Sequence, residues 1–141
     1  MASRLSGAAL VVALFTAGQA AALEGVTVTP IARKAETASG QPITLPQADV
    51  QVVVSVFEIA PGASLPVHKH PFARYALVEA GTLEVTHVES GAATVYRAGD
   101  FVVEMIDEWH RARNAGPDAV RLIVIDQVEG GVENTLLGRP D

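Results

Sequence analysis

Short runs of β-branched and apolar residues alternate with turn residues along most of the chain. The runs predict strands at residues 52–57, 75–78, 82–88, 93–96, 101–105, 109–113 and 121–128. Turns rich in Gly, Pro, Asn and Asp separate them, and no helical period of useful length appears after residue 22. Many short strands with a turn every 8–12 residues or so are typical of an all-β sandwich or barrel.

The first 22 residues have the pattern of a secretory signal peptide. Arg4 precedes an apolar run from Ala8 to Ala17, and the small residues Ala20 to Ala22 offer a cleavage site. A membrane-spanning helix needs about 20 apolar residues, and this run is shorter. We expect cleavage after Ala22 and a secreted or periplasmic protein with no membrane contact afterwards; the alternative is an anchor that is retained.

The rest of the chain divides by composition. Residues 23–49 are rich in Thr, Ala, Pro and Gln and predict an N-terminal arm with at most one short strand. Residues 50–128 hold the strands of one barrel, and residues 129–141 form a C-terminal tail. The apolar strand around Val54 and the arm provide edges that need covering, so we expect a homodimer.

Composition and charge exclude several function classes. The chain has no Cys, so it has no disulfide, no thiol nucleophile and no thiolate zinc site. Its net charge is −6 and its Lys and Arg residues do not cluster, which argues against nucleic acid or anionic lipid as a partner. A small molecule or a second copy of the chain is the expected partner.

His68 and His70 are the first sign of a binding site. Residues two apart on a strand point to the same face, so both imidazoles would emerge side by side and could hold one metal ion. The alternative is an exposed pair without a metal, because H-x-H is a common pattern.

The spacing around these histidines resembles the first motif of the cupin family. Gly62, His68, His70 and Gly81 stand at the family's intervals. Arg74 occupies the place of the family's glutamate.

A second stretch resembles the second cupin motif. Gly99, His110 and Asn114 keep the family's intervals, while Met105 replaces a proline and Asp107 replaces a glycine. The resemblance implies an all-β fold, a single cupin barrel of the double-stranded β-helix or jelly-roll type behind the signal peptide. Asn114 is then expected to be a structural turn residue.

The resemblance also implies that His68, His70 and His110 converge on one divalent transition metal inside the barrel. Imidazoles suit Fe, Mn, Ni, Cu or Zn, and three of them leave coordination positions open. The protein would then be a metal-dependent oxygenase with three histidine ligands, similar to a dioxygenase, or a related enzyme. Its substrate would be a small anionic molecule. The alternatives are a non-catalytic binder of a small molecule or metal, a barrel kept for assembly alone, and a barrel whose metal is lost.

Arg74 and Glu104 leave the rest of the site open. A guanidinium cannot ligate a metal, so Arg74 either anchors an anionic substrate at the cavity edge or turns outward or pairs with an internal carboxylate. If residues 105–109 form a hairpin loop, Glu104 faces His110. It would then be a fourth metal ligand, an acceptor for a histidine N–H, or the partner of Arg74; if it points outward, it is a surface residue.

Two further side chains are expected to lie outside the site. His87 is interpreted as an ordinary, partly buried histidine, and Trp109 as a packing residue at the rim of the barrel.

Overall fold

The structure is a computed structural model that describes residues 24–138 of the chain. The expected signal peptide, residues 1–22, lies outside the described residues. Contacts divide the chain into two units, Met1–Pro30 and Ile31–Asp141, and every strand belongs to the second unit. Within residues 24–138 the structure has no helix with the length and hydropathy needed to cross a membrane.

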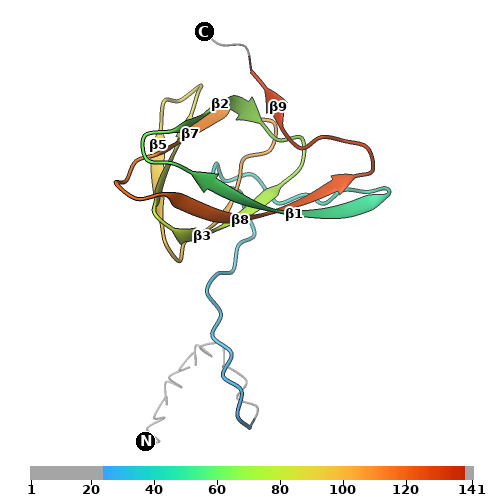
Figure 1. The fold of residues 1–141 in the computed structure, drawn as a ribbon. Coiled ribbons are helices and arrows are strands. Elements are labelled where there is room, and N and C mark those ends of the chain that lie inside the picture. Colours follow the sequence, from blue (N-terminus) through green and yellow to red (C-terminus); the bar gives the residue numbers. More distant parts are fainter. Residues whose placement is uncertain (1–23, 139–141) are drawn as a thin grey trace, which may run out of the picture. The chain divides into compact units, whose positions relative to one another are not determined.

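Residues 24–138 contain nine strands and no helix (Figure 1). The strands are β1 (Val50–Ile59), β2 (Ser64–Lys69), β3 (Arg74–Ala80), β4 (Thr82–His87), β5 (Ala93–Arg97), β6 (Phe101–Val103), β7 (His110–Asn114), β8 (Val120–Glu129) and β9 (Leu136–Leu137).

The strands form two antiparallel sheets. One has the order β1-β8-β3-β6 and the other the order β5-β4-β7-β2-β9. Strands that are far apart in the sequence pair along their whole length, as β1 does with β8 from Val50↔Glu129 to Ile59↔Val120. Two antiparallel sheets joined by such long connections form a jelly-roll barrel. The expected all-β fold is therefore confirmed.

Side-chain alternation places one face of each sheet inside the barrel. In β8 the residues Val120, Leu122, Val124, Asp126 and Val128 are buried, and the residues between them are more exposed. Each fully buried Val or Leu side chain stabilises the fold by about 1.5–3 kcal/mol. One of the five inward positions carries a carboxylate, which needs a partner because a buried charge without one is costly.

The sequence pattern did not define β2 and β9. Pro66 lies inside β2, and the pairing of β2 with β7 shifts its register between Leu65 and His68. A bulge of this kind accommodates a proline, but it also interrupts the period-two alternation by which strands are recognised. The two residues of β9 pair with the end of β2 and are too few to show any period.

Part of the expected N-terminal arm contacts the barrel. The N–H of Ala38 donates to the carbonyl of Val103 at 2.8 Å. The side-chain amide of Gln41 donates to the carbonyl of Ile106 at 2.9 Å and accepts from the N–H of the same residue at 2.9 Å. These bonds hold residues 38–41 against the chain that follows β6.

The outer face of the β1 sheet is apolar and exposed. β1 is an edge strand, and Val52, Val54 and Val56 on its outer face are 60%, 63% and 49% exposed. The register places Ile125 of β8 and Tyr75 of β3 in one row with Val54. An apolar surface that continues across several strands is typical of an interaction site.

Gly81 and Gly62 both have positive φ, at +83° and +76°, but only Gly81 is sterically enclosed. A Cβ on Gly81 would meet the carbonyl oxygen of Ala119 at 2.7 Å and Cα of Val120 at 2.8 Å, whereas a Cβ on Gly62 would meet nothing within 4 Å. An alanine at either position would therefore be strained by the positive φ. An alanine at position 81 would in addition clash with the backbone of Ala119 and Val120.

We expect Gly81→Ala to lower the free energy of unfolding by about 3 kcal/mol, and the matched control Gly62→Ala by about 1 kcal/mol. Urea denaturation of both variants measures the difference. Equal losses would contradict the close approach of Gly81 to the Ala119–Val120 backbone.

Candidate metal centre

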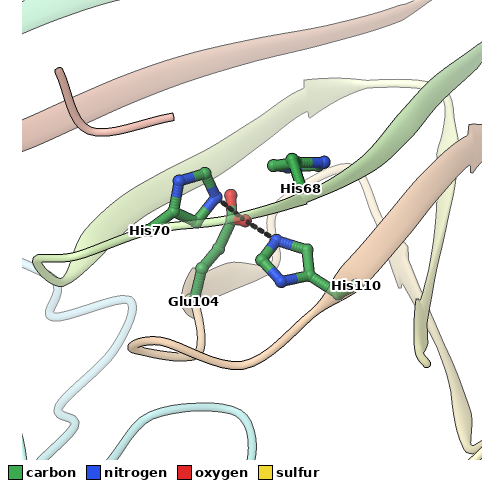
Figure 2. A group of neighbouring side chains, drawn as sticks. All are labelled: His68, His70, Glu104 and His110. Carbon is green, nitrogen blue, oxygen red and sulfur yellow. Dashed lines mark hydrogen bonds and ion pairs between the residues drawn. The ribbon is translucent and has the colours of Figure 1, made fainter. Parts of the chain in front are cut away.

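Four side chains with metal-binding atoms converge inside the barrel. One ligand atom from each of His68, His70, Glu104 and His110 lies within 4.8 Å of all the others (Figure 2). The three histidines are 5%, 0% and 0% exposed, and Glu104 is partly buried. Of the candidate site residues expected from the sequence, the structure brings these four together.

The two sheets supply different members of the cluster. His68 lies on β2 directly opposite His110, the first residue of β7. His70 follows β2 and forms an isolated bridge with Ile106. Glu104 follows β6, in the other sheet, where its N–H donates to the carbonyl of Arg74 at 2.8 Å.

The hairpin that was assumed for residues 105–109 does not form, because β6 and β7 belong to different sheets. Glu104 still points inward and faces His110, although it does so across the barrel interior instead of along a ladder. Its Oε2 lies 3.1 Å from Nε2 of His70 and 3.1 Å from Nε2 of His110.

The environment of Glu104 favours its charged form. Burial removes water from the carboxylate and raises its pKa. The hydrogen bonds that His110 and His70 donate when their Nε2 atoms carry a proton outweigh this effect. The pKa of Glu104 therefore lies well below its usual range. A carboxylate ion is thus present at the centre of the cluster.

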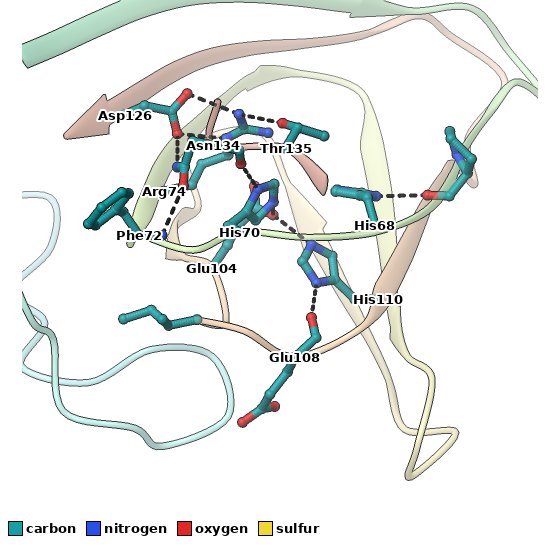
Figure 3. Close-up of polar contacts among 12 residues, drawn as sticks. His68, His70, Phe72, Arg74, Glu104, Glu108, His110, Asp126, Asn134 and Thr135 are labelled. Carbon is teal, nitrogen blue, oxygen red and sulfur yellow. Dashed lines mark hydrogen bonds and ion pairs between the residues drawn. The ribbon is translucent and has the colours of Figure 1, made fainter. Parts of the chain in front are cut away.

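The three histidine rings each use Nδ1 to bind a backbone carbonyl. His68 donates to Pro66 at 2.7 Å, His70 to Asn134 at 2.5 Å and His110 to Glu108 at 2.9 Å (Figure 3). A carbonyl oxygen can only accept, so Nδ1 carries the hydrogen in all three rings. In the neutral ring Nε2 then has a free lone pair, which is the arrangement typical of metal-binding histidines.

The cluster therefore fits a cation. When the rings are neutral, Nε2 of His70 and Nε2 of His110 are hydrogen-bond acceptors. Each faces Oε2 of Glu104, which is also an acceptor. Acceptors 3.1 Å apart repel each other unless protons or a metal ion lie between them. Three imidazole nitrogens and one carboxylate suit a divalent first-row transition metal such as Fe, Mn, Ni, Cu or Zn.

His68 is kept neutral by its surroundings. Burial lowers its pKa from 6.5 to about 4, and the hydrogen bond to Pro66 opposes this shift only in part. Its lone pair is therefore available to a metal well below neutral pH.

Arg74 does not join the four-residue cluster. Its Nε and Nη2 donate to the two oxygens of Asp126 at 2.9 and 3.0 Å, and Nη2 also donates to Oγ1 of Thr135 at 3.0 Å. Both partners of the Arg74–Asp126 pair are buried. These contacts match the second interpretation of Arg74, pairing with an internal carboxylate, and the carboxylate is Asp126 instead of Glu104.

Asn134 links this ion pair to the histidines (Figure 3). Its side chain donates to Asp126 at 2.6 Å and accepts from the N–H of Phe72 at 2.9 Å. Its own carbonyl accepts from His70. The ion pair therefore helps to hold the carbonyl that fixes the His70 tautomer.

Sequence reasoning missed Asp126 and Asn134. A signal existed for Asp126, because it occupies an inward position in the alternating run from Arg121 to Val128. No signal existed for Asn134, which lies in the connection between β8 and β9.

The remaining candidates lie outside the cluster. His87 pairs with Glu108 at 3.1 Å and hydrogen-bonds to Ser90 at 2.7 Å. Trp109 lies beside Lys69, whose Nζ is 5.1 Å from the ring centroid.

A cavity of about 120 Å³ adjoins the cluster. His68 and Glu104 line it on the side of the cluster, and most of the remaining wall is apolar. The other lining residues are Phe57, Leu65, Pro66, Arg74, Leu83, Val85, Ala112, Leu122, Val124, Thr135 and Leu137.

Comparison with known proteins gives one family match and several structural neighbours. A family model described as "Cupin domain" matches residues 55–126. No curated protein sequence matches the chain.

Oxalate decarboxylases are among the structural neighbours. The enzyme from Lactobacillus farciminis, in a formate complex, has a TM-score of 0.51 and 20% identity over 61% of this chain and 26% of its own. The enzyme from Bacillus subtilis, studied for its Mn(II) centres, has a TM-score of 0.51 and 20% identity over 61% and 23%. This chain thus spans about a quarter of the decarboxylase chains.

A structure of the DMSP lyases RdDddP and RnDddQII is also similar, with a TM-score of 0.52 and 15% identity over 62% of this chain and 44% of the other. At these identities the likeness to solved structures concerns the fold alone.

Lowering the pH from 7 to 5 should destabilise the metal-free protein through His68. The unfolded histidine takes up a proton near pH 6.5, whereas the folded one does so near pH 4. Between these values the unfolded state binds more protons, so the free energy of unfolding falls as the pH falls.

Urea denaturation at pH 7 and pH 5 measures the effect. The decline should be smaller in His68→Gln, which cannot titrate, than in the wild type. The same decline in both proteins would show that His68 is not the group responsible.

Proposed function

This chain belongs to the cupin domain family, and on that premise we propose that it is an exported protein that holds one divalent transition-metal ion and binds a small anionic molecule beside it, as a metal-dependent oxygenase or a related enzyme. His68, His70 and His110 are the proposed ligands, and Glu104 is the fourth.

One observation carries the metal proposal. All three rings bind backbone carbonyls through Nδ1, which leaves Nε2 of each ring free, and Nε2 of His70 and of His110 lie 3.1 Å from the Glu104 carboxylate. A bound ion would supply Lewis acidity and open coordination positions at this point. The protein contributes fixed ring orientations and an apolar cavity that limits the access of water.

Arg74 is proposed to support the cavity wall. It lines the cavity, but its Nε and Nη2 already donate to Asp126 and Thr135. The competing role, a substrate anchor, would have to use the remaining Nη1 atom or break the buried ion pair with Asp126.

A non-catalytic metal or small-molecule binder is the second candidate. The observation that favours it is the cavity lining: apart from the proposed metal ligands and the paired Arg74, the only polar side chain among the described lining residues is Thr135. Among the described residues that line the cavity, no side chain other than the proposed ligands can therefore act as a general acid or base. Oxygen uptake by the Fe(II)-loaded protein, tested with small carboxylates and phenols, distinguishes an oxygenase from a binder.

Export is proposed from the N-terminal sequence alone, through Arg4, the apolar run Ala8 to Ala17 and the small residues at the cleavage site. The absence of cysteine means that the fold needs no disulfide in an oxidising compartment.

We expect the purified, untagged protein to contain about one transition-metal ion per chain after reconstitution, and Glu104→Gln to weaken metal binding at least tenfold, because the variant loses the one negatively charged ligand. Elemental analysis and competition with a chromogenic chelator measure these quantities. Glu108→Gln is the matched control, since that side chain pairs with His87 outside the cluster. A protein without stoichiometric metal would contradict the proposal.

A second copy of the chain is proposed to cover the outer face of β1. β1 is a ten-residue edge strand with an apolar outer face, and two such faces can pack against each other about a twofold axis (Figure 1). Each copy would then cover the exposed valines of the other.

Light scattering is expected to give a dimer for the wild type and a monomer for Val54→Glu, because the new charge would be buried at the interface. Val88→Glu, on a different exposed valine, should leave the dimer intact. A monomeric wild type at working concentration would rule out this interface.

A further inference from the structure

The wall of the cavity beside the cluster is made of apolar side chains from both sheets. Phe57, Leu122 and Val124 come from the β1 sheet, and Leu83 and Val85 come from the opposite sheet. Such a wall binds an apolar group by releasing water from it, but it offers no hydrogen bonds to a second charged group.

Ionisable lining residues are few, and their charges are already balanced. Among the described lining residues they are His68, Glu104 and Arg74. Arg74 is 6% exposed and makes a two-point ion pair with Asp126, so the pair adds no net charge. Its guanidinium also lies 5.6 Å from the ring centroid of Phe57, on the cavity wall.

The charge of the loaded centre follows from its donors. Three neutral imidazoles and the Glu104 carboxylate carry a formal charge of −1, and a divalent ion changes this to +1. One negative charge on a ligand is therefore neutralised. A second would lie in a largely apolar wall, where the one cation among the described lining residues, Arg74, is already paired with Asp126.

From this balance we infer that the cavity selects a monoanion with an apolar body: a small molecule with one anionic, metal-binding head group and a branched aliphatic or aromatic remainder. The inference rests on the proposed metal function. A cavity of about 120 Å³ admits roughly six to eight non-hydrogen atoms, since an apolar protein cavity of similar size holds benzene. Dicarboxylates fit the volume but not the charge.

The test uses two ligands with the same α-hydroxycarboxylate head. 2-Hydroxy-3-methylbutanoate has an apolar isopropyl tail, and hydroxymalonate has a second carboxylate of the same shape in its place. Calorimetric titration of the Co(II)-loaded wild type with each ligand gives the affinities. The visible spectrum of the cobalt reports whether the head group enters its coordination shell.

2-Hydroxy-3-methylbutanoate should bind at least tenfold more tightly than hydroxymalonate and change the cobalt spectrum. Its amide, which is neutral, should bind at least tenfold more weakly than the acid. Equal or tighter binding of hydroxymalonate would overturn the inference, and so would binding of the acid without a change in the cobalt spectrum.

Asp126→Asn gives a second, independent readout. The substitution leaves the charge of Arg74 unbalanced beside the cavity, so the preference for the apolar ligand over hydroxymalonate should shrink at least tenfold. An unchanged preference in a folded variant would contradict the charge argument. If the variant does not fold, the wild-type comparison still decides.

The cobalt content is measured in every sample. A wild type that binds no cobalt contradicts the proposed metal function, and the inference falls with it. A wild type that binds cobalt stoichiometrically but prefers hydroxymalonate overturns the ligand class alone and leaves the metal function in place.

Discussion

The arrangement of the barrel interior depends on a concentration of hydrogen-bond acceptors at one buried point. The rings of His68, His70 and His110 give their N–H groups to backbone carbonyls, and the Glu104 carboxylate lies among the Nε2 atoms that remain. These groups can stay close together only if positive charge is placed among them. In the metal-free protein, protons can supply this positive charge. One divalent metal ion can also supply it, with a coordination geometry that suits imidazole ligands.

The acid of the cluster and the nearby arginine have separate partners. Glu104, after β6, is the acid that reaches the histidines. Arg74 points inward too, but it pairs with Asp126 and, through Asn134, helps to hold the carbonyl that orients His70. The cluster thus takes its carboxylate from Glu104, and the arginine belongs to a second, structural ion pair.

The remaining polar groups near the site are arranged so that little net charge is left in the cavity. Arg74 and Asp126 neutralise each other at hydrogen-bond distance, and the wall around them is aliphatic or aromatic. The cluster of three histidines and Glu104, through His68 and Glu104, is then the main polar feature of the described cavity wall, and the rest of that wall is largely apolar. The outer face of the same sheet is also apolar, because β1 carries valines on a surface that its own barrel leaves uncovered.

The sequence by itself determined the all-β class, most of the strands and the candidates for the site. Alternation in β8 and the apolar run in β1 are local properties, and the spacing of His68, His70 and His110 follows a family motif. Alternation failed at β2, because Pro66 interrupts the period, and at β9, which is too short to have one.

Only the tertiary structure decided the partners of the charged residues. Arg74 and Asp126 are 52 residues apart and meet because β3 and β8 pair in the register Arg74↔Asp126. Glu104 reaches His70 and His110 from the opposite sheet, and no hairpin relates it to them. Local pattern shows which way a side chain points along its own strand, but the register between distant strands and the approach of two sheets are set by the packing of the whole barrel.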